Sequence, residues 1–293
     1  MMHNLKLLAA LGCVCWATTC SAAVVVENQR CEYLVEPIGI DAQAPRLTWT
    51  VDADGPLPES FVVKVALSEK GLRSGKEVWR SPLVSGDSRR VVLDTEGVLA
   101  PHTRYVWQVE GTDGSGVNFT SPVASFETGK LGAADWSAKW ISDGKDKEFE
   151  PAPMLRKEFE IKKLPAAARA YVSAAGYYDL WINGERVGDS RMDPGYTHYD
   201  KRNLYATHDV TPLLRKGKNV VSAVLGNGFY NCQSKAVWDF ETARWRNRPA
   251  LMLEITGTDK KGNVSVLAMT DESWKGAVGP YTYNNIYSGD RYD

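Results

Sequence analysis

The sequence predicts an all-β protein built from two β-sandwich domains in succession. Apolar and polar residues alternate along many short segments, and runs rich in Gly, Pro, Asp and Ser separate those segments. Only one short segment has the signals of a helix. The chain has 293 residues, of which 43% are hydrophobic and 24% charged, which suits one or two ordinary cores.

The first 23 residues have the form of a secretory signal peptide. Lys6 precedes an apolar run of roughly a dozen residues, and the small residues Ser21, Ala22 and Ala23 follow. We therefore expect a secreted or periplasmic protein. Lipoprotein anchoring at Cys20 is the alternative, but the preceding "ATT" lacks the large aliphatic residue that such signals usually carry. No later segment reaches the roughly 20 apolar residues that a membrane-spanning helix needs.

The overall composition argues against some partners. A formal net charge of −1 provides no basic field, so we expect no nucleic acid partner. The chain has 10 Trp and 13 Tyr, and such rings serve both β cores and sugar-stacking surfaces. Only Cys31 and Cys232 follow the signal peptide, and the sequence leaves open whether they are paired or buried thiols.

The first predicted domain covers residues 27–130. The segment "RLTWTV" places Leu47, Trp49 and Val51 on one face of a strand. The segment "SFVVKVAL" does the same for Phe61, Val63, Val65 and Leu67. In "VLAPHTRYVWQVEGTD", apolar residues alternate around Tyr105. This stretch resembles the tyrosine corner of a fibronectin type III domain, which implies a sandwich of that type.

Residues 131–152 form a predicted linker, and residues 153–280 a second domain. Its segments "MLRKEFEI", "ARAYVSAAGYYDLWI", "NLYATHDV", "NVVSAVLG", "PALMLEITGTD" and "NVSVLAMT" are strand-like. Asn183 and Gly184 form the dipeptide preferred in a two-residue hairpin. A brief helix is predicted in "DVTPLLRKGKN", capped by Asp209 or Thr211. Antiparallel strands of this kind predict a jelly-roll, or galactose-binding-like, β-sandwich.

Four motifs carry a resemblance to a known family. The segments "LWINGERVGD", "DPGYTHYDKR", "DVTPLLRKGKN" and "LGNGFY" resemble the N-terminal domain of bacterial α-L-rhamnosidases of glycoside hydrolase family 78. The resemblance covers residues 140 to 280, roughly. The hairpin motif also recurs in jelly-roll domains of the β-galactosidase and β-glucuronidase group, whereas "DPGYTHYDKR" followed by "LGNGFY" favours the rhamnosidases.

The resemblance implies a division of labour within a larger enzyme. In that family, hydrolysis of terminal α-L-rhamnose takes place, with inversion, in a later (α/α)6 domain, for which this sequence offers too few helices. We therefore expect a non-catalytic N-terminal part of a rhamnosidase, with rhamnose-containing glycans and the catalytic domain of the same polypeptide as partners. Residues 281–293 resemble the start of a following, truncated β domain. No spacing here identifies the pair of carboxylates that glycoside cleavage needs.

Two loops contain the residue types that recognise pyranose rings, namely aromatic faces with planar polar groups. The first candidates are Asp193, Tyr196, Tyr199, Asp200 and Arg202. A second loop, "LGNGFYNCQSKAVWDFETARWRNRP", adds Asn227, Trp238 and Trp245. The alternative is structural: Asp193 and Pro194 build a turn, Tyr196 closes the sandwich end, and Arg202 pairs with Asp200.

No cofactor is predicted, but calcium is considered as a bridge to sugar hydroxyls. The resemblance suggests this role for oxygen ligands such as Asp193, Asp200 and Asn227, although no calcium-loop spacing is visible. No cluster with the spacing of a transition-metal site is found. Two further hypotheses stay open: a stand-alone secreted, lectin-like carbohydrate-binding module, and a scaffold whose loops only contact other domains.

Overall fold

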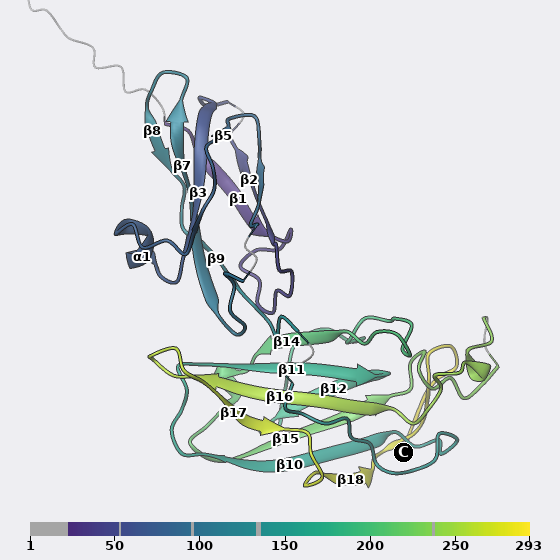
Figure 1. Ribbon diagram of the computed structural model, residues 1–293. Helices are drawn as coiled ribbons and strands as arrows, with labels where there is room; N and C mark the ends of the chain where they lie inside the picture. Colours follow the sequence, from purple (N-terminus) through teal and green to yellow (C-terminus); the bar gives the residue numbers. More distant parts are fainter. Residues whose placement is uncertain (1–22, 53, 95–96, 133–135, 236–237) are drawn as a thin grey trace, which may run out of the picture.

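The computed structural model describes residues 23–52, 54–94, 97–132, 136–235 and 238–293. Antiparallel strands dominate these residues and form two sandwiches, which confirms the all-β prediction (Figure 1). The predicted signal peptide lies outside the described residues, apart from Ala23. Within the described part, no helix combines the length and apolar character that crossing a membrane requires.

The first sandwich packs a three-stranded sheet against a larger one. The smaller sheet has the order β1 (Val26–Cys31), β2 (Arg46–Val51) and β6 (Arg90–Val92). The larger sheet has the order β4 (Trp79–Arg80), β3 (Pro58–Ala66), β7 (Arg104–Asp113) and β8 (Asn118–Thr120). Two further strands extend it, β5 (Val84–Ser85) beside β3 and β9 (Ala124–Glu127) beside β7.

The predicted alternation of the first domain holds in its centre and fails at one strand end. Leu47 and Trp49 are buried, and so is Tyr105, whose hydroxyl accepts a hydrogen bond from the backbone nitrogen of Ala100 at 2.9 Å. The tyrosine corner is therefore present. Leu67, which was predicted to share the buried face, is 60% exposed. The reason is local, because β3 ends at Ala66 and an unpredicted short helix, α1 (Glu69–Arg73), follows.

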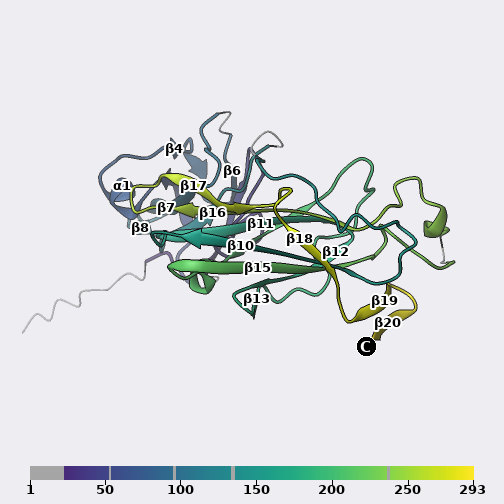
Figure 2. The same ribbon diagram turned by 90° about the horizontal axis from the view of Figure 1, so that it is seen from below.

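The second sandwich contains a five-stranded and a four-stranded sheet. The first has the order β13 (Glu185–Arg186), β12 (Tyr177–Ile182), β15 (Gly217–Gly226), β10 (Pro153–Ile161) and β18 (Lys275–Val278). The second has the order β14 (Tyr205–Asp209), β11 (Ala167–Ala175), β16 (Ala250–Thr258) and β17 (Val264–Met269). A separate hairpin of β19 (Tyr281–Asn285) and β20 (Gly289–Tyr292) ends the chain (Figure 2).

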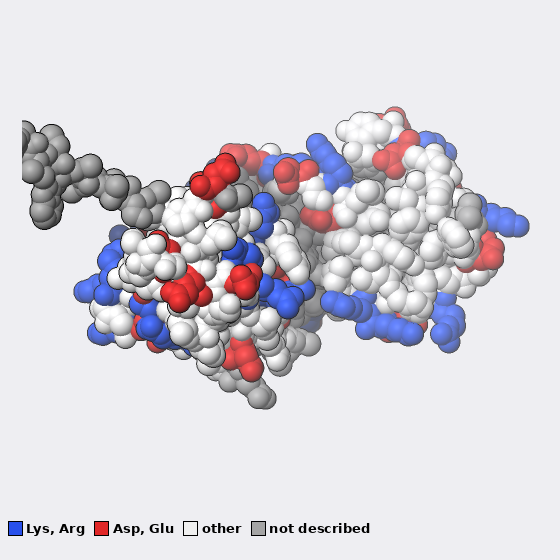
Figure 3. Space-filling model, turned by 90° about the horizontal axis from the view of Figure 1, so that it is seen from above, with Lys and Arg blue, Asp and Glu red and all other residues white. Residues whose placement is uncertain are grey.

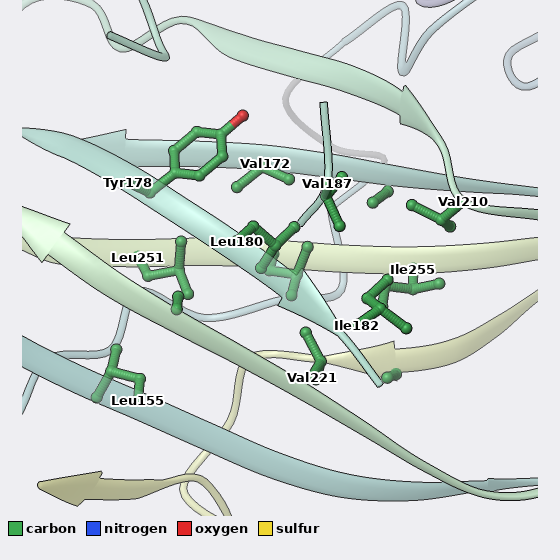
Figure 4. Close-up of a cluster of buried hydrophobic side chains, with 14 of the residues drawn as sticks. Leu155, Val172, Tyr178, Leu180, Ile182, Val187, Val210, Val221, Leu251 and Ile255 are labelled. Carbon is green, nitrogen blue, oxygen red and sulfur yellow. The ribbon is translucent and has the colours of Figure 1, made fainter. Parts of the chain in front are cut away.

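Apolar side chains from both sheets fill the space between them. Leu180, Ile182 and Val221 of the five-stranded sheet lie across from Leu251 and Ile255 of the other (Figure 4). The turn between β12 and β13 has positive φ at both central residues, 54° at Asn183 and 89° at Gly184, as the hairpin prediction required.

The predicted helix in "DVTPLLRKGKN" is shorter than expected. It is a single 3₁₀ turn, η2 (Thr211–Leu213), before β15 begins at Gly217. The Asn219 side chain explains the early stop. Its amide donates to the carbonyl oxygens of Arg215 at 2.7 Å and Gly217 at 2.9 Å, which holds the chain in a turn instead of a further helical turn.

Polar contacts join the two sandwiches. Arg169 of β11 donates to both carboxylate oxygens of Glu127 in β9, at 2.8 and 2.9 Å. Lys130 forms an ion pair with Glu254 of β16, and both side chains are almost fully buried. The Tyr205 hydroxyl of β14 donates to Asp41 at 2.6 Å. Because each pair links residues of both sandwiches, their relative orientation is fixed by specific bonds.

The two cysteines and the surface charges complete the description. Cys31 and Cys232 are both buried free thiols, which settles the question that the sequence left open. Burial, reinforced by the nearby Glu32, raises the pKa of Cys31 to about 12. Positive and negative side chains are interspersed on the face shown in Figure 3, without a large area of one sign.

Candidate functional site

The two candidate loops meet at one end of the second sandwich. One loop joins β13 to β14 and the other joins β15 to β16 (Figure 1). Aromatic rings of the two loops contact one another. The ring centroids of Tyr196 and Phe229 are 5.0 Å apart, and those of His198 and Trp245 are 4.6 Å apart. We call this group the aromatic cluster; its members are Tyr196, His198, Tyr199, Phe229, Tyr230, Phe240, Trp245 and Tyr287.

The rings of this end differ in exposure. Tyr199 is buried, and its burial raises the pKa of the hydroxyl. Trp245 is half-buried, and its Nε1 donates to the Phe229 carbonyl at 3.4 Å. Tyr196 is 46% exposed, and Trp238, just before the 3₁₀ helix η3 (Phe240–Thr242), is 77% exposed. Buried rings therefore support the loop end, while Tyr196 and Trp238 offer faces to solvent.

The polar candidates of the first loop do not gather in one place. Asp200 pairs with His198, and not with Arg202 as the structural alternative proposed. Arg202 is exposed and borders a hollow between the two sandwiches, together with Asp41 and Tyr205. The Asp193 carbonyl accepts from the backbone nitrogen of Tyr178 at 3.1 Å.

Asp193 also acts electrostatically on the residues beside it. The half-buried ring of His208 lies against Tyr178, whose hydroxyl is 2.8 Å from the ring Nε2. Burial lowers the pKa of His208, and the negative charge of Asp193 opposes that effect. Asp193 therefore belongs to the environment of the Tyr178–His208 pair, and its backbone contact agrees with a turn-building role.

Asn227 has an internal role. It is buried, and its side-chain amide donates to Gln233 Oε1 at 3.2 Å and to the Asn284 carbonyl at 2.9 Å. Its Oδ1 accepts from Asn231 Nδ2 at 2.9 Å. The predicted carbohydrate-binding residue Asn227 therefore uses its polar atoms to connect the second loop to β19.

The three proposed calcium ligands have different surroundings in the structure. Asp193 lies beside Tyr178 and His208, Asp200 beside His198, and Asn227 within a buried amide network. Among residues 23–293, with the gaps given above, no group of three or more His, Cys, Asp or Glu side chains could hold a metal ion.

A second feature adjoins the aromatic cluster and was not predicted from the sequence. It is a cavity of about 320 Å³ between the five-stranded sheet and the β19–β20 hairpin. We call it the hairpin pocket; its main lining residues are Tyr177, Asp179, Arg191, Gly226, Asn284 and Asp290. The motif "LGNGFY" connects the two features, because Gly226 and Gly228 line the pocket while Phe229 and Tyr230 belong to the aromatic cluster.

Comparison with known proteins assigns the two sandwiches. Residues 26–132 match the N-terminal immunoglobulin domain of Rha78A-like proteins, a two-sheet architecture that fibronectin type III domains share. Residues 163–293 match the α-L-rhamnosidase N-terminal domain. The division of the chain at residues 131–152 and 281–293 stays a prediction.

Relatives match over most of the chain. An α-L-rhamnosidase of Formosa agariphila is 31% identical over 286 residues, covering 88% of this chain and 30% of that protein. One of Alteromonas sp. is 29% identical, covering 96% of this chain and 32% of that protein. The structure of α-L-rhamnosidase from Dictyoglumus thermophilum has 30% identity and a TM-score of 0.82, covering 92% of this chain and 31% of that chain.

These matches all point to one class of glycosidase. The chain matches the N-terminal domains of the α-L-rhamnosidases of glycoside hydrolase family 78. It spans only about a third of the length of these relatives.

Proposed function

We propose that this chain is the non-catalytic N-terminal part of a secreted α-L-rhamnosidase, an enzyme that hydrolyses terminal α-L-rhamnose from glycans. Within that enzyme, it binds glycan near the aromatic cluster and supports the domain that performs the chemistry. The signal peptide predicted in residues 1–23 supports secretion. The match to rhamnosidase N-terminal domains, together with relatives about three times as long, supports the assignment to an N-terminal part.

One observation supports glycan binding in particular. Tyr196 and Trp238 keep large exposed aromatic faces at an end of the sandwich where other rings pack closely. An exposed indole is costly in water unless something covers it, and the C–H face of a pyranose is a suitable cover. The same observation favours the second candidate, a lectin-like module that binds glycan without any catalytic partner.

Affinity electrophoresis through a gel containing a rhamnose-rich polysaccharide tests the binding role. We expect Tyr196→Ala and Trp238→Ala each to weaken retardation about fivefold, the equivalent of one lost aromatic contact. Trp140→Ala is the matched control, because Trp140 is also exposed, at 43%, but stands outside the aromatic cluster. Equal retardation of all three variants and the unaltered chain would remove the binding role and leave a supporting one.

The coding DNA distinguishes the two candidates. A reading frame that continues beyond the codon for Asp293 into helical repeats supports the enzyme part. A stop codon at that point supports the lectin-like module.

A further inference from the structure

The hairpin pocket is built from segments that are far apart in the chain. Tyr177 and Asp179 come from β12, Gly226 from the end of β15, and Asn284 from β19. Asn284 holds the hairpin in place, because its Oδ1 accepts from the backbone nitrogen of Asn227 at 2.6 Å. Because this hydrogen bond holds the lining segments together, the cavity has a defined shape.

The side-chain amide nitrogen of Asn284 is not used in hydrogen bonding within the described fold. Asn284 is 8% exposed, and its Nδ2 has no hydrogen-bond partner among the described residues. The neighbouring Asn285 differs, because its amide nitrogen donates to Ser234 Oγ at 3.1 Å and its oxygen accepts from Tyr287 N at 2.9 Å. A buried donor without a partner is costly, and an acceptor on a bound molecule would remove that cost.

The charges around the pocket balance one another. Asp179 is neutralised by Arg186, whose Nη2 lies 2.5 Å from its Oδ1. Arg191 and Asp290 contribute one charge of each sign. The rest of the lining combines Tyr177 and Tyr281 with apolar residues such as Leu225 and Ile286. This mixture suits a neutral molecule that has both hydroxyl groups and an apolar face.

The volume limits the size of the ligand. About 320 Å³ is near the lower end of the range of small-molecule sites, which favours one ring over an oligosaccharide. We propose that the hairpin pocket binds a single neutral pyranose unit of a glycan. The Asn284 amide donates to a sugar hydroxyl, and the ring of Tyr177 covers a C–H face. This inference deepens the proposed glycan-binding role, on which it rests, but places the contact outside the aromatic cluster.

Two variants test the pocket from different directions. Gly226→Val fills it, because a Cβ at Gly226 meets Tyr177 Cβ at 3.5 Å and Asn284 Oδ1 at 3.9 Å without a clash, and valine suits a strand. Asn284→Asp keeps an oxygen for the Asn227 nitrogen and replaces the Nδ2 donor with a second carboxylate oxygen, which also adds a negative charge. Gly114→Val is the matched control, since nothing lies within 4 Å of a Cβ at that glycine in the first sandwich.

Ligand-observed NMR of the full chain with L-rhamnose, D-galactose, D-glucose and D-glucuronate provides the readout. We expect at least one neutral sugar to bind, at least tenfold weaker binding in Gly226→Val and Asn284→Asp, and unchanged binding in Gly114→Val. Circular dichroism shows whether Gly226→Val folds. If it does not, the test uses Asn284→Asp together with Arg191→Ala, a substitution at an exposed position. Unchanged sugar binding in both of these variants overturns the inference.

The outcomes also separate this inference from the proposed function. Binding that survives Gly226→Val but is lost in Tyr196→Ala and Trp238→Ala overturns the hairpin pocket and keeps the aromatic cluster as the glycan-binding surface. Absence of binding for every sugar overturns the hairpin pocket, while retention by the polysaccharide gel would still support the broader role.

Discussion

The Tyr105 hydroxyl shows how much structural information a single residue can carry. Tyr105 is 2% exposed, yet its hydroxyl reaches the backbone nitrogen of Ala100 at the turn before β7. The ring packs against Phe126 of β9, with centroids 5.3 Å apart. One side chain therefore ties the turn to the core of the first sandwich, which is why the alternation around it identified the fold.

Removing that hydroxyl should weaken the first sandwich measurably. We expect Tyr105→Phe to lower the free energy of unfolding by about 1 kcal/mol, since the ring stays buried and water can reach the exposed Ala100 nitrogen. Urea denaturation measures the change. Tyr292→Phe is the control, because Tyr292 is 70% exposed and should alter stability by less than about 0.5 kcal/mol. Equal effects would show that the corner bond contributes nothing of its own.

At the scale of elements, strands and turns follow from local patterns, while the hairpin pocket does not. The Asn183–Gly184 turn and the buried faces of β2 and β3 depend on residues next to one another, so the sequence predicts them. The five residues of α1 are too few for helical periodicity, and only the cap at Ser68 marks it. The hairpin pocket needs β12, β15 and β19 together, and no local pattern reports that contact.

The candidate loops show the same limit. Residue types alone placed Asp193, Asp200 and Arg202 in one site, since each is a plausible sugar ligand. In the fold, Asp193 lies beside Tyr178 and Asp200 beside His198. Arg202 borders the hollow between the sandwiches. The rings of Tyr196, Tyr199 and Trp245, which the sequence assigns to two separate candidate loops, meet at one end of the sandwich.

The Arg248 side chain binds the segment before β10 to the second sandwich. Arg248, just before β16, donates to both oxygens of Asp143, at 2.9 and 2.6 Å, and to the Phe149 and Pro151 carbonyls. Burial alone would raise the pKa of Asp143, but the hydrogen bonds and positive charge of Arg248 outweigh it and hold that pKa below its usual value. The ion pair is almost fully buried.

This pair should make stability depend on acid pH. The folded pKa of Asp143 is lower than its unfolded pKa, so its contribution is present above about pH 4 and is lost as pH falls through the folded pKa. We expect Asp143→Asn to cost about 3 kcal/mol at pH 7 and progressively less below about pH 4. Urea denaturation across this pH range measures it. A penalty that is constant with pH would show that the charge of Asp143 is not responsible.

At the scale of the whole molecule, the contacts between the sandwiches include buried ion pairs as well as hydrogen bonds. Lys130 and Glu254 form one such pair, and the Lys130 ammonium also lies 4.8 Å from the centroid of the Trp136 ring. The second carboxylate oxygen of Glu254 accepts from the Ser137 nitrogen at 2.8 Å. Glu254 therefore contacts both Lys130 of the first sandwich and Ser137 of the connecting segment.

Such a connection should make the two sandwiches unfold together. Neutralising Glu254 leaves the buried Lys130 charge without its carboxylate, so we expect Glu254→Gln to destabilise the chain by about 3–5 kcal/mol. In calorimetry, the single transition of the unaltered chain should separate into two, the first sandwich unfolding independently of the second. Glu272→Gln is the matched control, because its pair with Lys139 is mostly exposed and should contribute less than about 1 kcal/mol. Two transitions already present in the unaltered chain would mean that the sandwiches are joined but not coupled.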